Sequence, residues 1–170
     1  DLLICRGLGM NILLEKFTQQ DFDDYFRLVS DARVMAMITE RAIPVDEAGR
    51  DYQQLLIKNR AHPDAGHFRI LDADSGEFIG LGKLEIDPAS VDTAELGYMI
   101  LPVYWGKGIA GRVAAMLIAK ARELSPLCRL VAIIDPANLP SRKVLTNNGF
   151  VSREYKTFDG LPGEVLELTW

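Results

Sequence analysis

The order of hydrophobic and polar residues predicts strands and helices along most of the chain. The segment NILLEKF (11–17) has the character of a strand, and Thr18 is suited to cap the helix that follows it. In that helix the apolar residues recur at helical spacing, which indicates a face turned toward the core: Phe22, Tyr25, Phe26 and Val29. Further helices are expected over 32–38 and 44–61.

The middle of the chain predicts a hairpin and then a single strand. Asp74-Ser75-Gly76 is a turn sequence, and residues of β character lie on both sides of it, over 67–71 and 77–87. The next strand is expected over 94–101, AELGYMIL, and it ends just before Pro102.

The following segment predicts two helices that enclose a buried strand. A helix is expected over about 110–124, because its apolar residues fall on one face. The continuous apolar run RLVAIID (129–135) is typical of a strand that is covered on both faces. A short helix over 139–148 is expected to end at Gly149, which is suited to a left-handed C-terminal position.

Two closing strands are expected over 150–158 and 164–169, around the turn sequence DGLPG. Together the elements predict an α/β fold, in which helices flank one mixed sheet in a single domain over 10–170. The preceding residues 1–9, DLLICRGLG, are too short for a signal peptide and lack its flanking residues. They are expected to be an upstream extension or a cloning remnant.

Composition narrows the classes of partner and compartment. The chain has 170 residues, a formal net charge of −5 and a pI near 5.1, which disfavours a nucleic-acid partner. Its apolar helical runs are far shorter than a membrane span. Two cysteines are too few for a disulfide framework, and they suit a reducing compartment such as the cytoplasm.

The stretch WGKGIAGR (105–112) contains the pattern G-x-G-x-x-G, which also occurs in dinucleotide-binding turns. That interpretation does not fit, because Leu101–Trp105 separate the strand from the glycines and too little chain remains for further strand–helix units. A phosphate-binding P-loop does not fit either, since Lys107 is followed by glycine.

What remains is a glycine-rich turn at a helix N-terminus, where backbone N–H groups and the helix dipole favour an anion. Lys107 and Arg112 are expected to add positive charge there. The alternative is a plain loop, in which the glycines serve only close packing.

Two sequence signatures resemble those of the GNAT superfamily of N-acetyltransferases. In the pattern [Q/R]-x-x-G-x-[G/A], Gly108 and Ala110 match the last two fixed positions, while Trp105 stands where Gln or Arg is usual. The second pattern, N-x-x-S followed by G-F, is matched by four residues: Asn138, Ser141, Gly149 and Phe150. The resemblance is greatest to the branch that acetylates the N-terminal amine of ribosomal proteins.

The resemblance implies the GNAT fold, a central and largely antiparallel mixed sheet with one splayed parallel pair of strands, flanked by helices. The parallel pair would be 94–101 and 129–134, with a bulge near Met99–Leu101 that opens the gap. The pantetheine arm of acetyl-CoA would enter that gap and bond to freed backbone groups of Met99 and Leu101. The pyrophosphate would lie on the N–H groups of 106–111.

The expected acetyl-CoA-binding residues lie on three segments: Met99, Ile100 and Leu101; Trp105, Gly106, Lys107, Gly108, Ile109, Ala110 and Gly111; Asn138 and Ser141. For Asn138 and Ser141 the alternative role is helix capping. No metal ion is expected.

The reaction implied is direct attack of a primary amine on the acetyl thioester. Glu95 is the best-placed carboxylate to accept the amine's proton, and its alternative role is a cross-strand ion pair on the surface. Many relatives protonate the thiolate with a tyrosine four residues before G-F, but here that position is Leu145. Ser141, near the thioester sulfur, is the expected catalytic substitute, with Tyr104 and water as alternatives.

The acceptor is expected to be a small-molecule or peptide amine, with no nucleic acid and no membrane as partner. The sequence leaves open a homodimer and, as an alternative function, a non-catalytic acyl-CoA-binding sensor. Turnover of acetyl-CoA separates the enzyme from the sensor, whereas binding alone does not.

Overall fold

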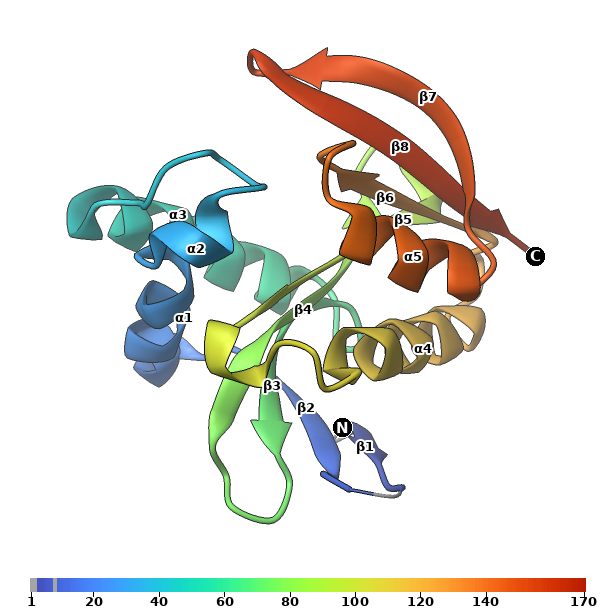
Figure 1. Cartoon of the computed structure of the whole chain (residues 1–170). Helices are drawn as coiled ribbons and strands as arrows, with labels where there is room; N and C mark the ends of the chain where they lie inside the picture. The colour runs from blue at the N-terminus through green and yellow to red at the C-terminus, as the bar shows by residue number, and fades with distance from the viewer. Residues whose placement is uncertain (1–2, 8) are drawn as a thin grey trace.

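Eight strands form one sheet in the computed structural model, which describes residues 3–7 and 9–170 (Figure 1). Their spatial order is β1-β2-β3-β4-β5-β6-β8-β7. The strands are β1 (Leu3–Cys5), β2 (Ile12–Lys16), β3 (Gly66–Asp72), β4 (Phe78–Asp87), β5 (Ser90–Ile100), β6 (Arg129–Ile134), β7 (Val151–Phe158) and β8 (Leu161–Thr169). All neighbouring pairs in this order are antiparallel except β5 and β6, which run parallel.

Helices cover both faces of the sheet. They are α1 (Phe22–Val29), α2 (Ala32–Met35), α3 (Val45–Ala61), α4 (Ile109–Arg122) and α5 (Leu139–Asn147), with short 3₁₀ turns η1 (Gln19–Asp21) and η2 (Pro102–Tyr104). Figure 1 shows α1, α2 and α3 gathered on one side of the sheet and α4 and α5 on the other. The predicted fold class, a mixed sheet with one parallel pair and flanking helices, is confirmed.

Each face of the sheet has its own hydrophobic core. One core joins the sheet to α4 and α5 and includes Val113, Leu117 and Leu145, all nearly inaccessible to solvent. The other joins the sheet to α1, α2 and α3 and includes Tyr52 and Leu81. Because strand side chains alternate between faces, consecutive residues of β5 contribute to opposite sides of the site.

The helix predicted over 32–38 ends at Met35, and among the strands the largest differences from the prediction are at the starts of β5 and β8. β5 begins at Ser90, because the hairpin pairing with β4 extends to the pair Asp87 and Ser90. β8 begins at Leu161, since Asp159 and Gly160 alone adopt the positive φ angles of the turn. The hairpins are therefore longer than turn residues alone indicate.

The N-terminal segment contributes a strand that the sequence did not predict. Leu3–Cys5 pairs with β2, and Arg112 of α4 donates hydrogen bonds to the carbonyl oxygens of Met10, at 2.6 Å, and Cys5, at 3.3 Å. The expectation that Arg112 adds free positive charge to the glycine turn is therefore wrong, because its guanidinium holds this segment. Of the predicted extension 1–9, residues 1, 2 and 8 lie outside the described residues.

Helix α4 lies close against β4 because glycine occupies position 82. A Cβ atom there would lie 3.3 Å from Cγ1 of Val113 and 3.5 Å from Cδ1 of Leu117. This close approach sets the height of α4 above the sheet, and with it the position of the glycine turn that precedes the helix. Within the described residues no helix is both long and apolar enough to cross a membrane.

We expect Gly82→Leu to lower the free energy of unfolding by about 1–3 kcal/mol, because the added side chain overfills the space beneath α4. Urea denaturation measures the change. The matched control is Gly49→Leu in α3, where a Cβ atom would meet nothing within 4 Å. That control should keep or raise stability, since leucine favours a helix over glycine. An equal loss in both variants would contradict the packing argument.

Candidate functional site

The parallel ladder between β5 and β6 stops partway along both strands. Its pairs are Thr93 with Arg129, Ala94 with Leu130, and Glu95 with Val131. Beyond them β5 continues to Ile100, while β6 stays paired with β8 as far as Ile134 and Glu164. The expected splay of the parallel pair is therefore present, and it opens at the C-terminal ends of β5 and β6.

The expected bulge near Met99–Leu101 is absent from the register of β4 and β5. Pairing is regular from Ile86 and Ala94 to Gly80 and Ile100, and the one register shift between these strands lies between Ile86 and Asp87. Each strand instead keeps its antiparallel neighbour. The parallel ladder, which is slightly less stable per residue, is the one that opens.

The backbone N–H and C=O groups of β5 that face the gap belong to other residues than those expected. The Leu101 N–H donates to the Ile79 carbonyl at 2.9 Å, so the polar groups of Leu101 point toward β4. Because backbone groups alternate along a strand, Met99 points the same way, and Tyr98 and Ile100 face the gap. The prediction that Met99 and Leu101 carry the freed backbone groups is therefore wrong. The Ile100 carbonyl accepts a hydrogen bond from the indole N–H of Trp105 at 2.8 Å.

The glycine turn presents free backbone N–H groups directly after this gap. Gly106 and Gly108 have φ angles of 74° and 75°, in the left-handed region that favours glycine. Gly108 caps α4 without a side chain, and no acidic residue lies in the helix's first turn. The N–H groups of the first turn, from Ile109 onward, therefore have no partner within the helix. A Cβ atom at Gly106, Gly108 or Gly111 would meet nothing within 4 Å, which shows that the turn is open.

Helix α5 begins on the other side of the gap. The side chain of Asn138 caps it by accepting a hydrogen bond from the Ser141 N–H at 3.3 Å, so the capping role is observed. Ser141 lies one turn into the helix, and its side chain is close enough to Tyr98 of β5 to influence the pKa of that hydroxyl. Leu145, one turn later, is 1% exposed and packs in the core.

An ion pair between a buried carboxylate and a half-buried guanidinium anchors α5 to β8. Arg142 donates to the Glu164 carboxylate at 2.6 and 3.0 Å, and the Tyr155 hydroxyl donates to it at 3.2 Å. Glu164 is 0% exposed. Burial acts to raise its pKa, but the hydrogen bonds from Arg142, Ser152 and Tyr155 prevail and hold the pKa below its usual value. Sequence reasoning missed this anchor, because its members are far apart along the chain.

The opposite face of β5 carries a cluster of charged side chains. Glu95 forms an ion pair with Lys83 of β4 at 3.0 Å, and its side chain is 40% exposed. Directly across the ladder lies Glu85, which contacts Lys58 of α3 at 2.7 Å and His67 at 3.3 Å. The predicted alternative for Glu95, a cross-strand ion pair, is therefore observed. The same geometry leaves Glu95 at the last paired position before the gap.

The family model of the acetyltransferase (GNAT) domain matches residues 11–151 of this chain. The chain belongs to the GNAT acetyltransferases. A curated relative, the uncharacterized N-acetyltransferase p20 of Bacillus licheniformis, is 26% identical over 153 residues, which cover 88% of this chain and 86% of the relative. The family match makes this protein an acetyltransferase that uses acetyl-CoA.

Solved GNAT structures share the fold. Spermidine N-acetyltransferase from Vibrio cholerae, in complex with CoA and spermine, has a TM-score of 0.76 at 20% identity, covering 93% of this chain and 95% of its own. Ribosomal-protein-S5-alanine acetyltransferase from Vibrio fischeri has a TM-score of 0.77 at 19% identity, covering 98% of this chain and 96% of its own. At these identities the likeness establishes the architecture alone.

Among the alternatives for a proton donor in this GNAT protein, Tyr104 is turned away from the gap. Its hydroxyl donates to Glu77 on the β3–β4 hairpin at 2.9 Å, and Lys107 lies over its ring at 5.7 Å. Neither histidine is beside Ser141. His62 accepts hydrogen bonds from backbone N–H groups just after α3, and His67 contacts Glu85.

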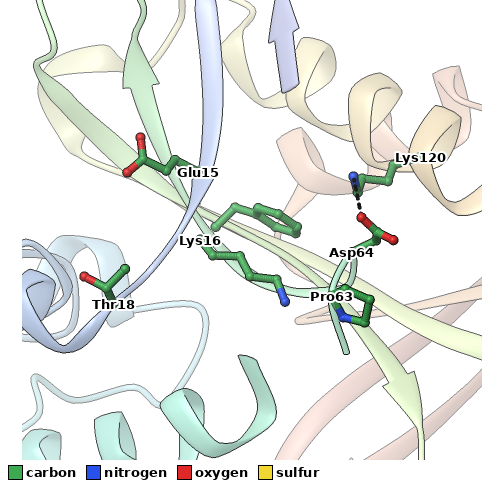
Figure 2. Close-up of a pocket in the computed structure, with 7 residues that line it drawn as sticks. Glu15, Lys16, Thr18, Pro63, Asp64 and Lys120 are labelled. Atoms are coloured by element: carbon green, nitrogen blue, oxygen red, sulfur yellow. Dashed lines mark ion pairs between the residues drawn. The ribbon is translucent and has the colours of Figure 1, made fainter. Parts of the chain in front are cut away.

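Two hollows mark the surface of this GNAT domain. One, of about 400 Å³, lies where α1 and α2 meet η2, and its lining includes Arg27, Asp31 and Leu101. The other, of about 290 Å³, holds Lys16 and Lys120, the latter 3.8 Å from Asp64 (Figure 2). Lys16 donates to backbone carbonyls at the end of α3, so this lysine has a structural role at that helix terminus.

Within the described part of the chain no cluster of three or more metal-binding side chains occurs. The charged groups of the site instead pair with one another. The close contact with His67, followed by that with Lys58, lowers the pKa of Glu85 to about 2, and burial lowers the pKa of His67.

We expect Glu85→Gln to lose about 1–3 kcal/mol of stability at pH 7, because Lys58 and His67 lose the charged carboxylate that they contact. A carboxylate with a depressed pKa stabilises the fold fully above its unfolded pKa, near 4.5, and ceases to do so as pH falls toward 2. Urea denaturation at pH 7, 5 and 3 should therefore show the difference between wild type and variant shrinking as pH falls. The control is Glu123→Gln, an exposed position after α4. A difference that is constant with pH would contradict this assignment.

Proposed function

We propose that this enzyme transfers the acetyl group of acetyl-CoA to a primary amine, of a small molecule or a peptide N-terminus, by direct attack of the amine on the thioester. The observation that carries the proposal is the junction of two features. An open edge of β5 is followed, after η2 and the glycine turn, by the N-terminus of α4, whose first N–H groups have no partner within the helix. A thioester carried on a long pantetheine arm with a pyrophosphate fits both features at once.

The residues of this junction fit acetyl-CoA in two ways. The backbone groups of Tyr98 and the N–H of Ile100 are available to the amides of pantetheine, as in the addition of an extra strand, while the Ile100 carbonyl already accepts from Trp105. The turn from Gly106 to Gly111 offers the pyrophosphate several N–H groups together with the positive end of the α4 dipole.

Side chains complete the proposed cofactor site. Lys107 supplies a mobile positive charge, and Trp105 shields the Ile100 carbonyl at the entrance. Met99 and Leu101 contribute side-chain contacts on the face of α1 and α2. Asn138 and Ser141 flank the gap from α5.

Direct attack is favoured over a covalent intermediate. A serine nucleophile needs a base to remove its proton, and both histidines of the chain lie away from Ser141. Glu95 is the carboxylate at the mouth of the gap, on the face of the sheet that α3 covers. We therefore assign to Glu95 the role of accepting the amine's proton. Its ion pair with Lys83 of β4 holds the carboxylate at this position.

The acceptor is proposed only as a class. Two solved neighbours, with TM-scores of 0.76 and 0.77, are named for acceptors of very different size, spermidine and a ribosomal protein. The free thiols Cys5 and Cys128 support a cytoplasmic location, where thiols stay reduced. Release of CoA from acetyl-CoA in the presence of a panel of polyamines, amino acids and peptides tests the function. Binding without turnover would favour the sensor.

We expect Glu95→Gln to reduce turnover at pH 7 by on the order of 10²-fold or more, because the amide keeps the size of the side chain but cannot accept the proton. Acetyl-CoA affinity should be unchanged, since the cofactor is held on other residues. Steady-state kinetics from pH 6 to 9 should show partial rescue at high pH, where more of the amine is already neutral. The matched control is Lys83→Met, which breaks the same ion pair and leaves the carboxylate. Equal profiles for Glu95→Gln and wild type would remove Glu95 from the mechanism.

We expect Gly108→Val to weaken acetyl-CoA binding at least tenfold, which corresponds to about 1.4 kcal/mol. A β-branched residue disfavours the φ of 75° and places methyl groups where the phosphates would lie. Gly76→Val is the matched control: its φ is 77°, its Cβ would also meet nothing within 4 Å, and it lies in the β3–β4 turn. Titration calorimetry should find binding intact in the control. Equal weakening in both variants would show that strain alone is responsible.

A further inference from the structure

The Tyr98 hydroxyl is buried, and no described residue, the neighbouring Ser141 side chain included, meets it with the distance and angles of a hydrogen bond. Leaving a buried hydroxyl without a partner lowers stability, because the group gives up its hydrogen bonds to water. Such groups are rare in folded proteins, and each one calls for an explanation. A phenylalanine would fill the same space without that cost, so the hydroxyl has a reason to be present that stability does not supply.

Tyr98 lies on the gap between β5 and β6. The parallel ladder ends at Glu95. Tyr98 lies three residues further along β5, and its side chain is on the same face of the sheet as that of Leu96. Its ring packs against the core formed with α4 and α5. The Ser141 side chain, on the first turn of α5, is near enough to oppose the rise in pKa that burial causes at Tyr98. The hydroxyl is thus held between the free edge of β5 and the start of α5.

The placement of Tyr98 relative to Glu95 suits the two proton transfers of the reaction. Glu95 and Tyr98 are three residues apart on one strand, so their side chains project from opposite faces of the sheet. An amine that approaches on the face of Glu95 leaves the thiolate to depart on the face of Tyr98 and Ser141. The position of the family's usual acid is occupied by Leu145, whose buried side chain packs in the same core as Tyr98.

We propose that Tyr98 donates the proton to the departing thiolate of CoA, an inference that rests on the proposed function. As the carbonyl re-forms, the carbon–sulfur bond breaks and its electron pair stays on sulfur. The Tyr98 O–H proton passes to that sulfur to give the thiol, and the phenolate then recovers a proton from solvent. The proton of the amine leaves separately through Glu95. Because burial raises the pKa of Tyr98, the hydroxyl is protonated and able to donate throughout the neutral range.

The test compares Tyr98→Phe with wild type, using acetyl-CoA and the best amine of the panel. We expect kcat to fall on the order of 10²-fold, the worth of a positioned acid, while the KM for acetyl-CoA stays within about twofold. The melting temperature should stay equal or rise, because the variant removes an unpaired buried hydroxyl. Tyr104→Phe is the matched control. It removes a hydroxyl that bonds Glu77 on the hairpin, and it should keep the kcat of wild type.

Each remaining outcome overturns a defined statement. An active wild type with an equally active Tyr98→Phe variant overturns this inference and leaves the proposed function intact. A Tyr98→Phe variant that loses kcat only together with several degrees of melting temperature shows a structural role instead. If Ser141→Ala loses the larger share of kcat while Tyr98→Phe is within about twofold of wild type, serine is the donor. A wild type that binds acetyl-CoA and acetylates no amine overturns the proposed function itself.

Discussion

The short parallel ladder between β5 and β6 is the constraint on which the site depends. Arg129 secures its closed end, because its guanidinium donates to Thr93 of β5 at 3.2 Å and to Glu167 of β8 at 2.9 Å. Beyond Glu95 each strand keeps only its antiparallel neighbour, which is the stronger pairing. The sheet therefore opens at one place without a bulge, and the polar backbone of β5 is left without a partner strand there.

The surrounding elements act by holding the two sides of this opening. On one side, Gly82 lets α4 approach β4, so the free N–H groups after Gly108 lie at the end of β5. On the other side, the buried pair of Arg142 and Glu164 ties α5 to β8. Breaking such a pair leaves a buried charge without compensation, so we regard it as a positional anchor rather than as a source of net stability.

Local signals explain why much of the fold could be predicted from the sequence. Helical spacing in α1 and α4, the Asp74-Ser75-Gly76 turn and the apolar run of β6 each act within a few residues. The glycine turn belongs to this group, since left-handed φ angles at Gly106 and Gly108 are a property of glycine itself. Backbone register is not a local property, because hydrogen bonds to a strand distant in sequence decide it. For this reason the expected bulge and the assignment of free backbone groups to Met99 and Leu101 were wrong.

By itself, the sequence determined the order of the helices and strands from β2 onward, the glycine turn at α4 and the family signatures around Gly108 and Asn138, since each is encoded in neighbouring residues. Only the tertiary structure decided which polar groups are satisfied. It pairs Glu95 with Lys83, turns Tyr104 toward Glu77 and leaves the Tyr98 hydroxyl unpaired within the described chain. The physical reason is that a hydrogen bond needs both partners at a fixed distance and angle, and residues far apart in sequence meet that requirement only after the chain has folded.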